Sequence, residues 1–352
     1  MNVEWRDFLE QAGAHWNGHQ VLGFGQAETE LDAAFNSDIC CDLSHFGLIA
    51  AQGADAERFL QGQLTCDVRQ VNAEHSLIGA HCNPKGRVLA SFRLFRREES
   101  YFLELPGAMT AAALSRLRKY LLMSKTTLED ASDALARIGV AGPNAEHLLR
   151  SALGAVPATV NSVIKSGLNP LITAIRLPGR QPRFELHGAA PELGAVWNAL
   201  KPDVTPVGAE PWRLLDILAG MPTIYPETVE AFVPQMINLQ QLEGISFQKG
   251  CYTGQEIVAR THYLGKLKRR MYLARIDSLN APRPGDALFS PQTDASQSAG
   301  QLADACQHPE GGYAVLAVAL IECAENGILQ WGDANGPVLQ IQPLPYEFDA
   351  AA

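Results

Sequence analysis

The chain has 352 residues, of which 47% are hydrophobic and 19% are charged, and its formal net charge is −10 at pH 7. At about 150 residues per domain, this length predicts two or three domains, each large enough to bury its own core. The apolar content excludes a chain that stays disordered, and the acidity argues against a general polyanion-binding surface.

The N-terminus carries acidic residues early and has no basic segment followed by an apolar core, which argues against a secretory signal. The longest apolar-rich stretch, residues 313–323, is far shorter than the roughly 20 residues that a membrane-spanning helix needs. We predict that it is a buried strand. We therefore expect a soluble, cytoplasmic protein.

The cysteines are seven in number, and no two of them form a Cys-x-x-Cys pair: Cys40, Cys41, Cys66, Cys82, Cys251, Cys306 and Cys323. This argues against a disulfide framework and against a zinc or iron-sulfur cage built by this chain alone, so no metal site is predicted. We expect most of these thiols to be inert and buried. Cys40 and Cys41 could form a redox pair, but two buried residues entering a strand are the simpler interpretation.

Along the first half of the chain, helices and strands alternate without a regular crossover period. Strands are predicted at 48–51, 87–95, 101–105 and 136–140, with antiparallel pairing between the second and the third. Helices are predicted at 56–60 and 111–123, and from Gly142 through Leu149. A turn is predicted at Asn83-Pro84-Lys85-Gly86, directly before the strand at 87–95.

Residues 154–208 are rich in glycine and proline, and they predict only a strand near 172–176 and a helix near 191–200. An apolar helix follows at 212–218. Beyond Lys268, strands at 270–276, 287–289, 312–320 and 338–341 are separated by turn residues. This last pattern predicts a small all-β terminal domain.

The segment around Cys251 carries the most specific local signal. Thr253-Gly254-Gln255-Glu256 fits a capping box and predicts a helix that starts there and stops at Gly265, with Ile257 and Leu264 on one face. Cys251 then lies just ahead of a helix N-terminus and two residues after Lys249, and both features place positive potential near its sulfur. A buried structural cysteine in a tight turn remains the alternative.

No nucleophile and base can be paired from the sequence, because nothing fixes the distance of His45, His81 or His262 from Cys251. The chain contains no phosphate loop and no dinucleotide fingerprint. Between residues 249 and 270, six basic residues accompany one acid, so the local charge is +5. This pattern is typical of a local anion site, or equally of a solvated charge run.

The run Lys249-Gly250-Cys251-Tyr252-Thr253-Gly254-Gln255-Glu256, extended to Val258-Ala259-Arg260, resembles the YgfZ branch of the folate-binding, glycine-cleavage T-protein-like family. The resemblance covers most of the chain. Its other matching segments are residues 43–47, 55, 59–67, 83–87, 232–235, 238–239 and 244–247.

This resemblance implies an α+β fold, with a core of interlocked subdomains around a central folate-sized opening over residues 1–265 and a C-terminal antiparallel β-barrel over residues 266–352. It implies that Cys251 is the functional thiol. By the same resemblance, the cofactor-binding residues are Lys249, Gly250, Tyr252, Gly254, Gln255, Glu256 and Arg260.

The same resemblance implies binding of tetrahydrofolate, or of a one-carbon or polyglutamylated derivative of it. The implied role is accessory: the assembly or repair of iron-sulfur clusters for radical enzymes that thiomethylate tRNA. The implied partners are therefore folate and either iron-sulfur assembly proteins or these client enzymes. The basic run after Cys251 would suit the glutamate tail of a folate, since carboxylates pair with lysine and arginine.

The chain departs from the aminomethyltransferase of this family at two places. Two acids of that enzyme are replaced by Ala90 and Ser91, and a pterin-binding glutamate before Ala-Gly is replaced by Leu218. We therefore reject glycine-cleavage activity and expect folate to bind more weakly or in a different pose.

Two alternatives stay open at this point. The first is a folate-dependent one-carbon transferase or demethylase that uses Cys251 as its nucleophile. The second is direct tRNA binding through Lys266, Lys268, Arg269 and Arg270, which the overall acidity disfavours.

Overall fold

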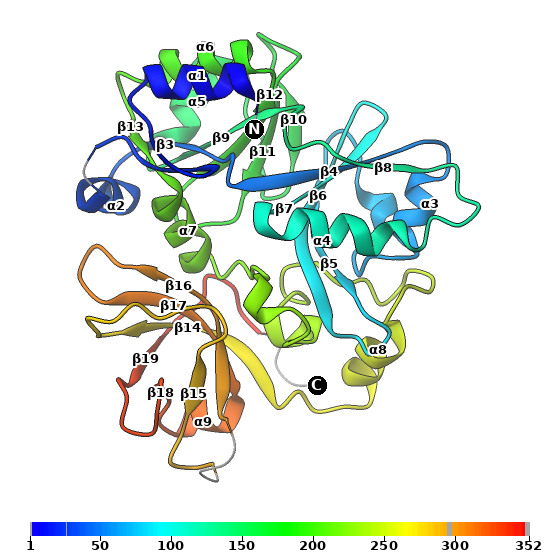
Figure 1. The fold of residues 1–352 in the computed structure, drawn as a ribbon, viewed down its shortest axis with the longest axis vertical. Coiled ribbons are helices and arrows are strands. Elements are labelled where there is room, and N and C mark those ends of the chain that lie inside the picture. The colour runs from blue at the N-terminus through cyan, green and yellow to red at the C-terminus, as the bar shows by residue number, and fades with distance from the viewer. Residues whose placement is uncertain (1, 26, 294–297, 349–352) are drawn as a thin grey trace. The chain divides into compact units, whose positions relative to one another are not determined.

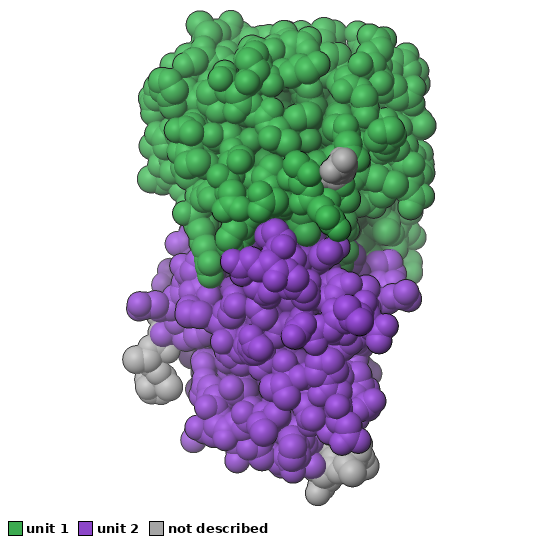
Figure 2. Space-filling model, turned by 90° about the vertical axis from the view of Figure 1, so that its left-hand side faces the viewer, with its two compact units in different colours: residues 1–56, 69–77, 93–215 green, residues 57–68, 78–92, 216–352 purple. Residues whose placement is uncertain are grey.

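The computed structural model describes residues 2–25, 27–293 and 298–348. The chain forms two compact units, which Figure 2 shows in different colours. Unit 1 comprises residues 1–56, 69–77 and 93–215, and unit 2 comprises residues 57–68, 78–92 and 216–352. The units thus interleave along the sequence. The predicted domain boundary after residue 265 falls inside unit 2 and stays a prediction.

Unit 1 is built around a six-stranded sheet with the strand order β10-β11-β12-β9-β3-β13. Neighbouring strands are antiparallel except β13 and β3, which are parallel. The strands are β3 (Ile39–Asp42), β9 (Ala136–Ala141), β10 (Val163–Lys165), β11 (Thr173–Leu177), β12 (Arg183–Gly188) and β13 (Thr205–Val207).

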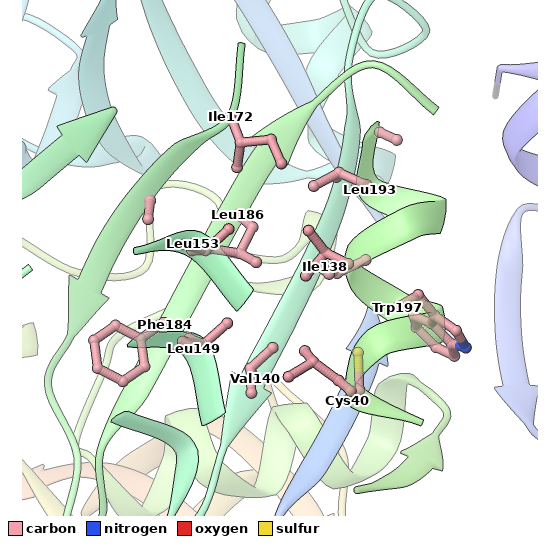
Figure 3. Packing of buried hydrophobic residues seen from close by; sticks show 14 of the residues in the cluster. Cys40, Ile138, Val140, Leu149, Leu153, Ile172, Phe184, Leu186, Leu193 and Trp197 are labelled. Atoms are coloured by element: carbon pink, nitrogen blue, oxygen red, sulfur yellow. The ribbon is translucent and has the colours of Figure 1, made fainter. Parts of the chain in front are cut away.

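Both faces of this sheet are buried. Successive side chains of a strand point to opposite faces, and each face packs into its own apolar cluster. On β3, Cys40 packs into one apolar cluster while Ile39 and Cys41 pack into another. Figure 3 shows the first cluster, in which Phe184 and Leu186 of β12 meet the helices that cover this face. These helices are α1 (Val3–Gln11), α5 (Ala145–Leu153) and α6 (Ala190–Leu200) (Figure 1).

A second group of strands in unit 1 has the order β6-β7-β4-β8. Its strands are β4 (Phe46–Gln52), β6 (Val88–Arg97), β7 (Ser100–Pro106) and β8 (Thr127–Asp130), and α4 (Gly107–Arg118) packs on them. The remaining elements of unit 1 are β1 (His15–Asn17), β2 (Gln20–Gly23) and α2 (Ala27–Asn36). Helix α7 (Ala209–Leu218) begins in unit 1.

The N-terminal part of unit 2 holds helix α3 (Ala56–Gln61), strand β5 (Leu77–Cys82) next to the start of β6, and helix α8 (Gln255–Tyr263). Short 3-10 helices lie at η1 (Val68–Gln70), η2 (Pro226–Thr228) and η3 (Pro234–Ile237). Among the described residues, no helix is both long and apolar enough to cross a membrane.

The C-terminal part of unit 2 is a six-stranded antiparallel sheet with the order β18-β15-β16-β17-β14-β19, and it curls into a half-barrel over its own apolar cluster (Figure 1). Its strands are β14 (Arg269–Ile276), β15 (Ala287–Phe289), β16 (Gly300–Gln307), β17 (Tyr313–Leu320), β18 (Gln330–Trp331) and β19 (Leu339–Gln342). The predicted antiparallel β-structure at the C-terminus is confirmed, but the region is not all-β, because it also contains one short helix. The buried strand predicted at 313–323 ends at Leu320, where helix α9 (Ile321–Asn326) begins.

The helix predicted at 111–123 is shifted toward the N-terminus. It begins at Gly107, directly after Pro106, whose extended backbone sets the helix start. It ends at Arg118, so Leu121 lies beyond it. Met123 adopts a left-handed backbone (φ 61°), which a continuing helix could not accommodate.

Candidate functional site

The loop that carries Cys251 is held at one end by Lys249. This lysine is only 5% exposed, and its ammonium group donates hydrogen bonds to the backbone carbonyl oxygens of Leu64 (2.7 Å) and Cys66 (2.6 Å). Charge-assisted bonds of this kind are about twice as strong as neutral ones. Lys249 therefore ties the loop to the segment that follows α3.

Tyr252 holds the other end of the loop. Its side chain is 6% exposed, and the Lys249 ammonium lies 5.2 Å from the centre of its ring. Burial, with smaller contributions from Cys82 and Cys66, raises the pKa of Tyr252. Its hydroxyl group is buried and makes no hydrogen bond to the described residues, so the ring serves as an apolar anchor.

Between these two anchors, Gly250 and Cys251 face solvent. A Cβ atom built on Gly250 would meet no described atom within 4 Å. Cys251 is exposed, whereas the other six cysteines are buried. The expectation that most thiols lie in the core is thus confirmed. The fold presents one thiol on a loop whose neighbouring side chains are fixed.

We expect native thiol titration to find one rapidly reacting cysteine among seven. Burial raises the pKa of Cys66 to about 11 and of Cys82 to about 12, so these thiols stay protonated as well as shielded at neutral pH. The Cys251→Ser variant should lose the fast phase entirely, and unfolding in urea should release the six remaining thiols. Two or more fast thiols in the native protein would contradict this geometry.

The predicted capping box does not form. Helix α8 begins at Gln255, and its N-cap is Gly254, which makes no side-chain capping bond. The Thr253 hydroxyl instead lies 3.4 Å from the side-chain oxygen of Gln63. Glu256 forms an ion pair with Arg260 (2.9 Å). Cys251 is therefore three residues ahead of the N-cap rather than two.

Gly254 fixes where the helix starts, because it has a left-handed backbone (φ 85°) and sits against the turn between β5 and β6. A Cβ atom at this position would lie 2.5 Å from the Asn83 carbonyl oxygen and 3.0 Å from the Gly86 Cα. Only glycine fits both the conformation and the space.

The buried face of α8 also differs from the predicted one. Val258 is fully buried, and its carbonyl oxygen accepts a hydrogen bond from the Gln235 side chain (2.6 Å). Ile257 is partly buried, but Leu264 is 85% exposed. The helix ends at Tyr263, close to the predicted stop at Gly265.

The basic residues of this region divide into two groups. In the first group, Arg260 forms an ion pair with Glu256, and Arg270 forms an ion pair with Glu325. Arg269 donates to the Ser298 carbonyl oxygen (3.0 Å).

Lys266 and Lys268, by contrast, are both exposed. Both residues lie in the segment of the chain between α8 and β14. Gln255, the remaining predicted cofactor residue, is partly buried in the first turn of α8.

The three candidate bases lie in different environments. His45 is in unit 1, where burial and, secondarily, Arg137 lower its pKa to about 3, so it is neutral. His81 is buried in β5. His262 is exposed at the end of α8 and stacks on Phe247, with ring centroids 3.8 Å apart.

The three positions where the aminomethyltransferase pattern has acids, Ala90, Ser91 and Leu218, are all buried in this chain. Leu218 is 6% exposed. The Ser91 hydroxyl donates to the Pro222 carbonyl oxygen (3.2 Å) and accepts from the Ile224 amide (3.1 Å), so it is occupied within its own unit. Position 218 therefore offers a ligand no carboxylate.

Comparisons with known proteins show which family the chain resembles. The family model of the GCVT N-terminal domain matches residues 7–242. The tRNA-modifying protein YgfZ of Colwellia psychrerythraea strain 34H is 34% identical over 306 residues, which cover 87% of this chain and 92% of that protein. The tRNA-modifying protein YgfZ of Sodalis glossinidius is 34% identical over 304 residues, which cover 86% of this chain and 92% of that protein.

A similar fold is known from a solved structure. The crystal structure of glycine cleavage system aminomethyltransferase T from Bartonella henselae has a TM-score of 0.76 and 16% identity, covering 98% of this chain and 97% of that chain. This likeness confirms the predicted T-protein-like α+β fold. The family model and the two relatives show that the chain belongs to the family of the GCVT N-terminal domain, in its YgfZ branch.

Proposed function

We propose that this protein is a folate-binding accessory factor for iron-sulfur cluster assembly or repair, acting in the cytoplasm for radical enzymes that thiomethylate tRNA. It works through the thiol of Cys251. Its similarity to proteins named tRNA-modifying protein YgfZ supports a role in tRNA modification.

The observation that carries this proposal is the construction of the Cys251 loop. Exposed apolar or sulfur-bearing side chains are common, but here Lys249 and Tyr252 are both buried while the two residues between them face solvent. A buried lysine is rare unless it is paired, since desolvating its charge costs free energy. A short loop that is fixed by two buried side chains is typical of a functional group that must be held in one orientation.

The ligand we propose is tetrahydrofolate. Its glutamate tail is anionic, and the exposed Lys266 and Lys268 would bind that tail. Gly250 would permit close approach of the ligand to the backbone, because no described atom crowds it. When bound, tetrahydrofolate would serve as a carrier of one-carbon groups. The absence of a carboxylate at Leu218 leads us to expect a weaker hold on the pterin than in the aminomethyltransferase pattern.

Calorimetric titration tests the ligand. We expect micromolar binding of tetrahydrofolate, tightened by a polyglutamylated tail. Lys266→Gln/Lys268→Gln should remove most of the gain from the longer tail, with little change for the monoglutamate, because each exposed ion pair is worth only about 0.2–1 kcal/mol. Lys119→Gln/Lys125→Gln, a pair of exposed lysines in unit 1, is the matched control.

The titration would count against the proposal if neither folate form bound. Equal affinity for the mono- and polyglutamate forms would keep the folate and remove Lys266 and Lys268 from its site.

The second candidate is a folate-dependent one-carbon transferase or demethylase in which the exposed Cys251 thiol acts as nucleophile. Steady-state product formation from a folate substrate, abolished by Cys251→Ser, would favour it over the accessory role. No turnover with intact folate binding would favour the accessory role.

A further inference from the structure

A cluster of ionisable side chains lies buried between strands β7 and β12, which belong to different strand groups of unit 1. Glu104 of β7 and Glu185 and His187 of β12 are at most 5% exposed. On β12 these polar residues alternate with Phe184 and Leu186, which face the helices. The opposite face of the same strand therefore carries charge into the interior.

His187 is the most unusual member of this cluster. It is fully buried against the ring of Phe95, with ring centroids 4.5 Å apart. Neither of its ring nitrogens has a hydrogen-bond partner among the described residues. Nδ1 lies 3.9 Å from a Glu104 carboxyl oxygen, and Nε2 lies 3.9 Å from a Glu185 carboxyl oxygen. Orphaned buried polar groups call for a physical explanation.

The geometry argues against a single metal ion at this place. A metal ion binds one ring nitrogen of a histidine, and its other ligand atoms must approach the ion on that same side of the ring. Here the two carboxyl groups approach opposite nitrogens. Two guanidinium groups also lie near the carboxyl groups and would repel a divalent cation.

The cations in and around the cluster are shared among several acids, because Arg137 acts on Glu104, Glu185 and Asp42 at once. The acids that share this region are Glu104, Glu185 and Asp42 of β3, and the cations are Arg93 of β6 and Arg137 of β9. Arg93 lies 3.6 Å from Glu185. Arg97 of β6 also acts on His187. Burying two neighbouring carboxylates that share their cations with other acids is costly, and one of such a pair takes up a proton instead.

We propose that Glu104, Glu185 and His187 form a proton-binding site that holds one proton at neutral pH and makes the packing of β7 against β12 pH-sensitive. The proton resides on Glu104 and is shared in a hydrogen bond with Glu185. Burial and, secondarily, Glu185 raise the pKa of Glu104 well above its ordinary range. Burial and the nearby arginines lower the pKa of His187, which stays neutral.

The sign of the pH dependence follows from this assignment. Because the folded protein holds a proton that an unfolded glutamate releases above about pH 4.3, unfolding releases one proton at neutral pH. The unfolding equilibrium constant should therefore rise by up to tenfold per pH unit until the folded pKa is passed. His187 acts in the opposite sense only below about pH 6.5, where the unfolded imidazole takes up a proton.

Urea unfolding of the full chain between about pH 7 and 8 tests the proposal, a window above the histidine range and below most thiol titration. Tryptophan fluorescence reports mainly on unit 1, which contains four of the five tryptophans. Glu104→Gln keeps the shape of the side chain and the hydrogen-bond donor but cannot ionise. The ratio of wild-type to variant unfolding constants should rise up to tenfold over this unit of pH.

The matched control is Glu99→Gln, whose carboxylate is 94% exposed, and its ratio to wild type should stay flat. A flat ratio for Glu104→Gln would overturn the proposal. A second readout does not depend on the variant folding: the infrared spectrum of the wild-type protein at pH 8 should contain the carbonyl band of a protonated carboxyl group, and its absence would also overturn the proposal. Stabilisation by zinc that Glu104→Gln abolishes would replace the proton with a metal.

Discussion

Replacing Gly254 with alanine should lower the free energy of unfolding by about 2–4 kcal/mol. The left-handed backbone at this position costs an L-residue about 1–2 kcal/mol, and overpacking against rigid neighbours adds about 1–3 kcal/mol. The atoms that a Cβ would meet first are the backbone of Asn83 and Gly86, which cannot move aside as a flexible side chain could. Urea unfolding followed by circular dichroism measures the loss.

The matched control for this substitution is Gly250→Ala in the same loop. Gly250 has no positive φ among the described residues, and its Cβ would meet open space. The change should therefore alter stability by less than about 0.5 kcal/mol. Equal losses for the two glycine variants would mean that the contact with the turn between β5 and β6 does not set the start of α8.

Replacing Lys249 with methionine should destabilise the protein by about 2–4 kcal/mol. The substitution keeps most of the side-chain volume but removes both charge-assisted bonds to the carbonyl oxygens of Leu64 and Cys66. Hydrogen bonds to charged groups contribute about 1.5–3 kcal/mol each, partly offset because a buried ammonium group no longer has to be desolvated. The midpoint of urea unfolding gives the size of the effect.

Lys266→Met serves as its control, since Lys266 is exposed and should contribute less than about 0.5 kcal/mol. If Lys249→Met were as stable as wild type, the ammonium group would not anchor the loop. In that case a direct role of Lys249 toward a ligand, as the resemblance implied, would become the better interpretation.

Four of the six β-strands beyond Lys268 could be predicted because each is a short apolar run bounded by turn residues, whereas β16 and β18 were not predicted. Strand β12 could not be predicted, because its second face consists of Arg183, Glu185 and His187. These residues look like a solvent-facing pattern in the sequence. Only the tertiary structure shows that both of its faces are buried, since partners from other strands surround the charged face.

The candidate site was located from the sequence, but its construction was not. The Thr-x-x-Glu pattern matched a capping box, yet contact with the Asn83–Gly86 turn places Gly254 at the N-cap instead. The partners of Lys249 are backbone carbonyls 183 and 185 residues earlier in the chain. Backbone groups leave no trace in residue identities, so this anchor could not have been predicted.

The most direct test of the proposed function measures thiomethylated tRNA in cells that lack their own copy of this protein. The cells carry wild type, Cys251→Ser, Cys251→Ala or an empty vector. Wild type and both variants must reach equal soluble levels in the cell. We expect this because Cys251 is exposed, so its replacement leaves the core unchanged. We expect wild type to restore thiomethylation and Cys251→Ser to leave it at the level of the empty strain. Full restoration by Cys251→Ser would contradict the central claim that this thiol is the functional group.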